Sequence, residues 1–243
     1  MSTNAIKVRD ASQKEFIALF ERLARRHGRF DVWSDFVVMS AIAISNSVDF
    51  HFWEKREQEY MERIGKYAPE EGNLFAEMLT QVVVGLTRHP EQDYLGTVFS
   101  ALHLHDEWKG QFFTPYHIAV FMAQINIPKN PDEWKSKSTV TVSDPACGAG
   151  CLMIAYANEL EKVFPDAKRK TVFYAQDIDR IAGLMAYIQL SLLGCRAVVK
   201  IGDSLLNPFT ENEPITENIW LTPMECFPFL FEIPAKSAIV KEE

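Results

Sequence analysis

The sequence predicts an α/β fold preceded by an all-α N-terminal domain, and three observations support this prediction. Apolar residues recur at helical spacing through the first half of the chain, as Phe16, Leu19, Phe20 and Leu23 do. A polar connector rich in proline and lysine follows over residues 128–138. Beyond it, short runs of strand-forming residues alternate with helical stretches, which is the pattern of parallel β-α-β units.

Each expected helix of the first domain, residues 1–109, has its own hydrophobic pattern. The stretch 74–86 repeats apolar residues at helical spacing. The stretch 36–48 is apolar almost all round, which is typical of a helix buried in the middle of a bundle. The stretch 51–67 is rich in charged residues and predicts a solvated helix.

The second domain, residues 110–243, begins with a loop and a helix over 110–127 and continues into the alternation of strands and helices. Strands are expected at 140–142, 172–175 and 197–201, with a further candidate at 218–221. Helices are expected over 150–164 and 180–193. The sheet is therefore predicted to be mainly parallel and, with so few strands, truncated.

Composition limits the class of protein. The 243 residues are 47% hydrophobic and 24% charged, as in soluble globular proteins, which excludes a disordered or fibrous chain. No apolar stretch approaches the roughly 18 residues of a membrane helix, so we expect a cytoplasmic protein that contacts no membrane. Four cysteines are too few for a disulfide scaffold. The net charge of −8 gives no compositional support for tight DNA binding by this chain alone.

The most informative stretch is DPACGAG, from Asp144 to Gly150, where the first strand ends and a helix begins. Open α/β sheets bind ligands at such a position, and Gly148 and Gly150 let the backbone pass close to a ligand. A dinucleotide-binding turn has a third glycine where this sequence has Met153. Asp144 would repel a phosphate but suits a cationic group. This favours S-adenosylmethionine, which carries an ammonium and a sulfonium and no phosphate.

Acidic residues also follow the next two expected strands. Asp177 ends the second strand, where a carboxylate can accept hydrogen bonds from two ribose hydroxyls. Asp179 is a second candidate for that role, although its position suits the N-cap of the next helix better. Asp203 follows the third strand, where it would accept a hydrogen bond from the adenine amine.

A helix start lies upstream, in GQFFTP. Thr114 is expected to be the N-cap and Pro115 the first helical residue. The free N–H groups there would suit the carboxylate of a methionine moiety. Phe112 and Phe113 are expected to be core residues. One face of this helix carries Ile118, Phe121, Met122 and Ile125.

The strings GQFFTP, DPACGAG, AQDID and GDSL, in this order, resemble the N6-adenine DNA methylases related to the methylation subunit of type I restriction–modification systems. The resemblance spans roughly residues 10–210 and implies a Rossmann-like class I methyltransferase core that acts on DNA adenine. It implies a cofactor site formed by Phe113, Thr114, Pro115, Asp144, Pro145, Ala146, Gly148, Gly150, Asp177, Ile178, Asp203 and Ser204.

The sequence departs from that family at the catalytic signature. The family carries Asn-Pro-Pro followed by Phe or Tyr after the fourth strand, and no such string occurs here. The corresponding position is 220–225, where Thr222 and Pro223 would stand in the catalytic place. Either Phe227 or Phe229 would have to stack on the flipped base.

Other residues are given structural roles. Residues 227–234 alternate aromatic and other side chains, which predicts an added edge strand or a surface for a partner that supplies a second methyltransferase half. His103, His105, Asp106 and Glu107 are expected to be surface residues. Cys147 and Cys151 lack the spacing and the second pair of a zinc site, so no metal is expected.

Two functions from different classes remain open. The leading one is methyl transfer to adenine N6 in DNA, with a partner subunit that supplies DNA specificity. The alternative is a catalytically degenerate module that binds S-adenosylmethionine and regulates or scaffolds a DNA-modification or antirestriction assembly. A weaker third reading is methylation of a protein or a small molecule.

Overall fold

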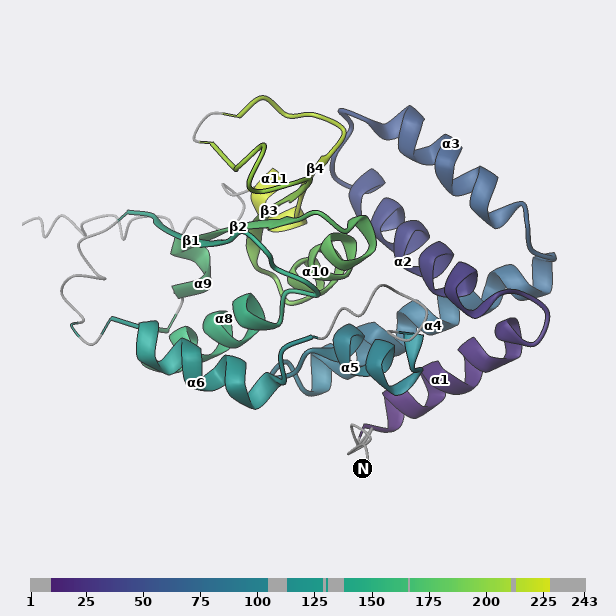
Figure 1. Ribbon diagram of the computed structural model, residues 1–243, viewed down its shortest axis with the longest axis horizontal. Coiled ribbons are helices and arrows are strands. Elements are labelled where there is room, and N and C mark those ends of the chain that lie inside the picture. Colours follow the sequence, from purple (N-terminus) through teal and green to yellow (C-terminus); the bar gives the residue numbers. More distant parts are fainter. Residues whose placement is uncertain are drawn as a thin grey trace, which may run out of the picture.

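The computed structural model describes residues 10–104, 113–128, 130, 138–165, 167–210 and 213–227. Over these ranges it confirms the predicted fold class. A run of helices comes first, and a mainly parallel four-stranded sheet with flanking helices follows (Figure 1). No helix in these ranges has the length and apolar character needed to cross a membrane.

The helices of the first half match the periodicity of the sequence. They are α1 (Ala11–Ala24), α2 (Arg29–Asn46), α3 (Trp53–Ile64), α4 (Pro69–Arg88) and α5 (Tyr94–Ala101). As predicted, α2 is buried on nearly all sides, because it packs against both α3 and α10 (Arg180–Leu192). As predicted, α3 is solvated, and Arg56 is its one buried residue.

The sheet has the order β1 (Val140–Asp144), β2 (Thr171–Asp177), β3 (Arg196–Ile201) and β4 (Ile219–Leu221). The first three strands are parallel, and α8 (Cys151–Val163), the short α9 (Ala167–Lys170) and α10 occupy the connections between them. In Figure 1, α8 and α10 lie on one side of the sheet and the segment between β3 and β4 lies on the other. On that second side the ring of Tyr174 packs edge-on against Phe209, with ring centroids 5.0 Å apart.

The fourth strand is present, but β4 runs antiparallel to β3. No helix is described between these two strands, and an antiparallel neighbour needs no crossover helix. The short helix α11 (Pro223–Cys226) that follows β4 therefore lies beside the start of β3, not beside its end.

One hydrophobic core runs through the helical half and the sheet. It contains Phe16 and Trp33 of the helices as well as Phe173 of β2 and Trp220 of β4. The predicted boundary between residues 109 and 110 lies outside the described residues, so the division into two domains stays a prediction.

Candidate functional site

The carboxyl ends of β1, β2 and β3 form one edge of the sheet. Asp144 at the end of β1 lies opposite Ala175 of β2, and Asp177 at the end of β2 lies opposite Ile201 of β3. Asp203 comes two residues after Ile201. The structure therefore brings the three predicted acidic residues to the same edge, where doubly wound sheets bind their ligands.

The turn between β1 and α8 requires both of its glycines. Gly148 has φ 54° and Gly150 has φ 88°, a left-handed conformation that other residues adopt at a cost. A Cβ atom on Gly148 would lie 3.2 Å from Cδ1 of Phe113. A Cβ atom on Gly150 would lie 3.1 Å from Cβ of Ala186 in α10. The turn thus lies close to the side chain of Phe113 on one side and to α10 on the other.

Asp177 connects this turn to the loop after β2. Its Oδ2 accepts a hydrogen bond of 2.8 Å from the N–H of Gly148, and its Oδ1 accepts one of 2.8 Å from the N–H of Asp179. A carboxylate oxygen has two lone pairs, so both oxygens keep a lone pair for ribose hydroxyls. Asp179 caps α10 by accepting from the N–H groups of Ile181 and Ala182, as predicted.

The electrostatics of this edge favour a cation. Oδ1 of Asp144 accepts a 3.1 Å hydrogen bond from the N–H of Ala146, whereas its buried Oδ2 finds no hydrogen-bond partner in the described ranges. Burial raises the pKa of Asp144. Burial also raises the pKa of Asp177, and the negative charges of Asp179 and Asp144 add to that shift. A cationic ligand would lower the free-energy cost of keeping Asp144 and Asp177 ionised, and a phosphate would raise that cost.

Asp203 shapes the turn that follows β3. Its Oδ1 accepts hydrogen bonds from the N–H groups of Leu205, at 2.8 Å, and Leu206, at 3.1 Å. Both leucines are almost fully exposed, and Ile178 in the neighbouring loop is 69% exposed. The predicted contact of Asp203 with the cofactor's adenine amine, and the predicted roles of Ile178 and Ser204 in cofactor binding, stay predictions.

The start of α6 (Tyr116–Asn126) corrects one expectation. Pro115, not Thr114, is the N-cap, because its ψ of 134° is extended and helical geometry begins only at Tyr116. The carbonyl oxygen of Thr114 accepts a 3.2 Å hydrogen bond from Sγ of Cys151. The start of α6 therefore lies beside the start of α8, next to the glycine turn. Phe113 packs edge-on against Phe99 with ring centroids 5.3 Å apart, as expected of a core-facing residue.

Thr222 and Pro223 are not brought to this edge. Thr222 is fully buried, and its hydroxyl donates to the carbonyl oxygen of Cys195 and accepts from the N–H of Ala197, both at 2.8 Å. Cys195 and Ala197 lie at the start of β3, whereas the three aspartates follow strand ends. Because β4 is antiparallel, its last residue lies at the opposite edge of the sheet. The threonine hydroxyl has a structural role there.

Two residues that hold the glycine turn in place, Gln189 and Asp93, were not foreseen from the sequence. Gln189 of α10 is fully buried, and its Nε2 donates 2.8 Å hydrogen bonds to the carbonyl oxygen of Ala149 and to Oδ1 of Asp93. Its Oε1 accepts a 3.0 Å hydrogen bond from the N–H of Leu95. The turn is thus tied to the start of α5. An amide within the apolar stretch 181–193 was the available signal.

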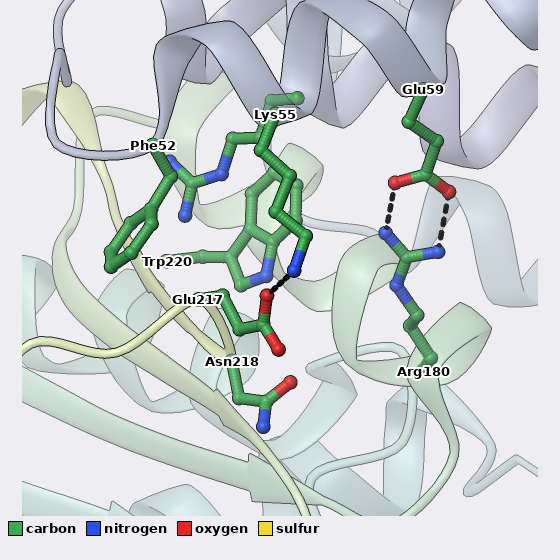
Figure 2. Close-up of a pocket in the computed structure, with 8 residues that line it drawn as sticks. Phe52, Lys55, Glu59, Arg180, Glu217, Asn218 and Trp220 are labelled. Carbon is green, nitrogen blue, oxygen red and sulfur yellow. Dashed lines mark hydrogen bonds and ion pairs between the residues drawn. The ribbon is translucent and has the colours of Figure 1, made fainter.

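A second connection joins α3 to the loop after β2. Both oxygens of Glu59 accept 2.7 Å hydrogen bonds from the guanidinium of Arg180, the first residue of α10 (Figure 2). Burial alone would raise the pKa of Glu59, but the hydrogen bonds and charges of Arg180 and Arg63 outweigh it and lower that pKa. The pair borders a cavity of about 270 Å³ between α3, α10 and β4. Lys55 and Glu217 form an ion pair on this cavity.

Several predicted features fall outside the described residues: Phe112, His105, Asp106, Glu107, Phe229 and the rest of the alternating stretch 228–234. Within the described ranges, no group of three or more histidine, cysteine, aspartate or glutamate side chains is arranged to hold a metal ion.

The fold and this edge define an α/β protein with a candidate ligand site at the carboxyl ends of parallel strands. Residues 95–224 match the sequence model of a family described as N-6 DNA Methylase. This match covers more than half of the 243 residues, so the chain belongs to the N-6 DNA methylase family. A comparison with curated protein sequences gave no significant match.

The solved structures that are similar to the chain include the following two. One is a Listeria monocytogenes protein assigned to the class I S-adenosylmethionine-dependent methyltransferases, with 15% identity and a TM-score of 0.44 over 84% of this chain and 57% of that one. The other is the methyltransferase subunit of a type I restriction–modification system from Streptococcus thermophilus, with 20% identity and a TM-score of 0.40 over 83% and 41%. The chain thus spans about half the length of these structures.

Proposed function

We propose that the chain binds S-adenosylmethionine at the carboxyl edge of β1, β2 and β3 and serves methyl transfer to N6 of adenine in DNA. One observation carries the proposal. Three adjacent parallel strands bring Asp144, Asp177 and Asp203 to one edge, around a turn with two left-handed glycines. Membership of the N-6 DNA methylase family supports the same ligand and reaction.

The residues at this edge fit the ligand. The buried oxygen of Asp144 that has no partner in the described ranges would accept from the ammonium, and Asp177 would accept from the ribose hydroxyls. Asp203 would accept a hydrogen bond from the amine of the cofactor's own adenine. The first N–H groups of α6 would bind the carboxylate, because Pro115 leaves them without a side-chain cap. When bound there, S-adenosylmethionine would supply the electrophilic methyl group of its sulfonium for transfer to the amine of a DNA adenine.

The amine of the target adenine in DNA needs a hydrogen-bond acceptor of its own, and among the described residues the predicted Thr222 and Pro223 do not lie at the candidate cofactor site. Thr222 cannot serve, because its hydroxyl is buried and hydrogen-bonded at the opposite edge of the sheet. We therefore assign this role, together with DNA specificity, to a partner subunit.

The position of Thr222 at the opposite edge of the sheet also favours a second candidate function. If the chain holds the cofactor and no acceptor lies beside it, as none of the predicted catalytic residues does in the described ranges, it would act as a regulatory or scaffolding module in a DNA-modification or antirestriction assembly. Such a module binds S-adenosylmethionine and transfers no methyl group.

Calorimetric titration with S-adenosylmethionine and with its demethylated product tests the cofactor site. Binding should be seen with the unsubstituted chain and should be lost in Asp144→Ala and Asp177→Ala. The exposed Asp31 of α2 offers a matched control, and Asp31→Ala should bind like the unsubstituted chain. If neither compound binds to the folded chain, both candidate functions are wrong.

Methyl transfer is tested separately with donor labelled on its methyl group and with unmethylated DNA. The chain is assayed alone and in its native complexes, and label should enter adenine only in the complexes. Binding without any label in DNA supports the second candidate. Label that enters a protein or a small molecule overturns both DNA-linked functions.

A further inference from the structure

Helix α3 depends largely on charged side chains for its attachment to the rest of the chain. Arg56 is its one buried residue, and Tyr60 and Ile64 are only partly buried where they pack against the core. Among its ion pairs, the one between Glu59 and Arg180 reaches α10, the helix that follows the acidic edge of the sheet (Figure 2). This pair therefore joins a solvated helix to the candidate cofactor site.

The ion pair between Glu59 and Arg180 has a defined geometry. Nη1 of Arg180 donates to Oε1 of Glu59 and Nη2 donates to Oε2, both at 2.7 Å. A contact through two parallel hydrogen bonds fixes the orientation of both side chains, because neither group can turn without breaking one of the bonds.

Glu59 is itself held from the other side. Nε and Nη2 of Arg63 donate to its Oε1 at 3.1 and 3.0 Å. Nη1 of Arg63 in turn donates a 2.5 Å hydrogen bond to Asp35, a buried residue of α2. An isolated surface ion pair contributes little, whereas this one belongs to a network that is anchored in the interior of the helical half.

Arg180 lies where it can control the loop after β2. It is the first residue of α10 and directly follows Asp179, the N-cap of that helix. The N–H of Asp179 donates a 2.8 Å hydrogen bond to Oδ1 of Asp177. A shift at the start of α10 would therefore move this N–H group and turn the carboxylate of Asp177.

We propose that Glu59 and Arg180 are positioning residues for the part of the candidate cofactor site that binds ribose. They fix the start of α10 and thereby the direction in which the Asp177 carboxylate faces. This inference rests on the proposed function, since it takes Asp177 as the acceptor for the ribose hydroxyls. It gives α3 a role in ligand binding although none of its residues is assigned to contact the ligand.

Calorimetric titration with two ligands tests this role. One ligand is S-adenosylhomocysteine, the demethylated product, and the other is its analogue without the two ribose hydroxyls. In Glu59→Gln, which keeps the shape of the side chain and removes its charge, the affinity for S-adenosylhomocysteine should fall by about 5-fold or more. The affinity for the analogue should change by less than about 2-fold, because that ligand has no hydroxyl for Asp177. A general loosening of the fold would weaken both ligands alike.

The two partners should act as one unit. Arg180→Gln should weaken S-adenosylhomocysteine as much as Glu59→Gln does, and the double variant should bind no more weakly than either single variant. Glu62 of α3, an exposed carboxylate bonded to Gln58, offers a matched control, and Glu62→Gln should leave both affinities unchanged. Thermal unfolding of each variant establishes that it is folded before titration.

The proposal is overturned if Glu59→Gln binds S-adenosylhomocysteine normally or if it loses affinity for both ligands equally. It is also overturned if Arg180→Gln restores the affinity that Glu59→Gln has lost, because Arg180 would then compete for Asp177 and not position it. If the unsubstituted chain binds neither ligand, the proposed cofactor site is wrong and this inference falls with it. The two kinds of failure are thus distinguishable.

Discussion

Gln189 in α10 donates a hydrogen bond of 2.8 Å to the main-chain oxygen of Ala149, inside the turn that separates β1 from α8. The same amide holds Asp93 at the start of α5. The conformation of the glycine turn is therefore set by the helical half of the chain as well as by the turn itself. This link adds hydrogen bonds between the helical half and the sheet to the hydrophobic core that both halves share.

Replacing Gln189 by leucine should destabilise the fold. The change removes the hydrogen bonds that Gln189 makes with the N–H of Leu95, the carbonyl oxygen of Ala149 and Oδ1 of Asp93. This loss should lower the free energy of unfolding by about 2 to 4 kcal/mol. Denaturant unfolding measures the loss. Gln58 of α3, an exposed glutamine bonded to Glu62, gives the control, and Gln58→Leu should change stability by less than about 0.5 kcal/mol. Equal effects of the two changes would contradict the role of Gln189.

Asp93 should make stability depend on pH. Burial raises the pKa of Asp93 to about 6, against the hydrogen bonds from Gln189 and Gly96, which lower it. The folded chain thus holds this proton more tightly than the unfolded chain, so the stabilisation is complete below pH 4 and is lost as the pH rises through 6. In Asp93→Asn this loss is absent.

The measurement compares the unsubstituted chain with Asp93→Asn by denaturant unfolding across this pH range. The free energy of unfolding of the unsubstituted chain should fall relative to the variant by about 2 kcal/mol between pH 4 and pH 7. Asparagine keeps an oxygen that can accept from Gly96 and Gln189, so the comparison isolates the proton. A constant difference between the two chains would show that Asp93 titrates normally.

Gly150 and Gly194 form a matched pair. Both have a left-handed φ, 88° and 67°, but a Cβ atom on Gly194 would meet nothing within 4 Å, whereas one on Gly150 would lie 3.1 Å from Cβ of Ala186. Gly194→Ala should cost about 1 kcal/mol for the backbone alone. Gly150→Ala should cost at least about 1 kcal/mol more, because α10 must shift away. Similar unfolding midpoints for the two variants would mean that the turn can move without cost.

Thr222 should affect stability and not cofactor binding. Thr222→Val removes the hydroxyl that bonds Cys195 and Ala197, which should cost about 2 kcal/mol, and Thr222→Ser should keep most of that stability. Calorimetric titration with S-adenosylmethionine should give the same affinity for both variants. A valine variant of normal stability that binds the cofactor weakly would place Thr222 at the cofactor site after all.

The helices, the strands and the acidic edge of the sheet could be predicted from sequence patterns alone. The helical spacing of Phe16 and Leu23, the turn from Asp144 to Gly150, and the aspartates after the second and third strands are local patterns, and local backbone preferences govern them. Parallel pairing of the first three strands then follows from the connecting helices. The N-cap at Asp179 was also predictable, because a cap depends on neighbouring residues only.

Features that depend on residues far apart in the sequence became visible only in the folded chain. No local pattern states whether β4 lies parallel or antiparallel to β3, and that orientation moves Thr222 to the opposite edge. Likewise, only packing shows that α6 turns its alanines inward and its isoleucines outward, and that Gln189 meets Asp93. Strand pairing and helix contacts are selected by the total burial and hydrogen bonding of the folded chain, which no short segment encodes alone.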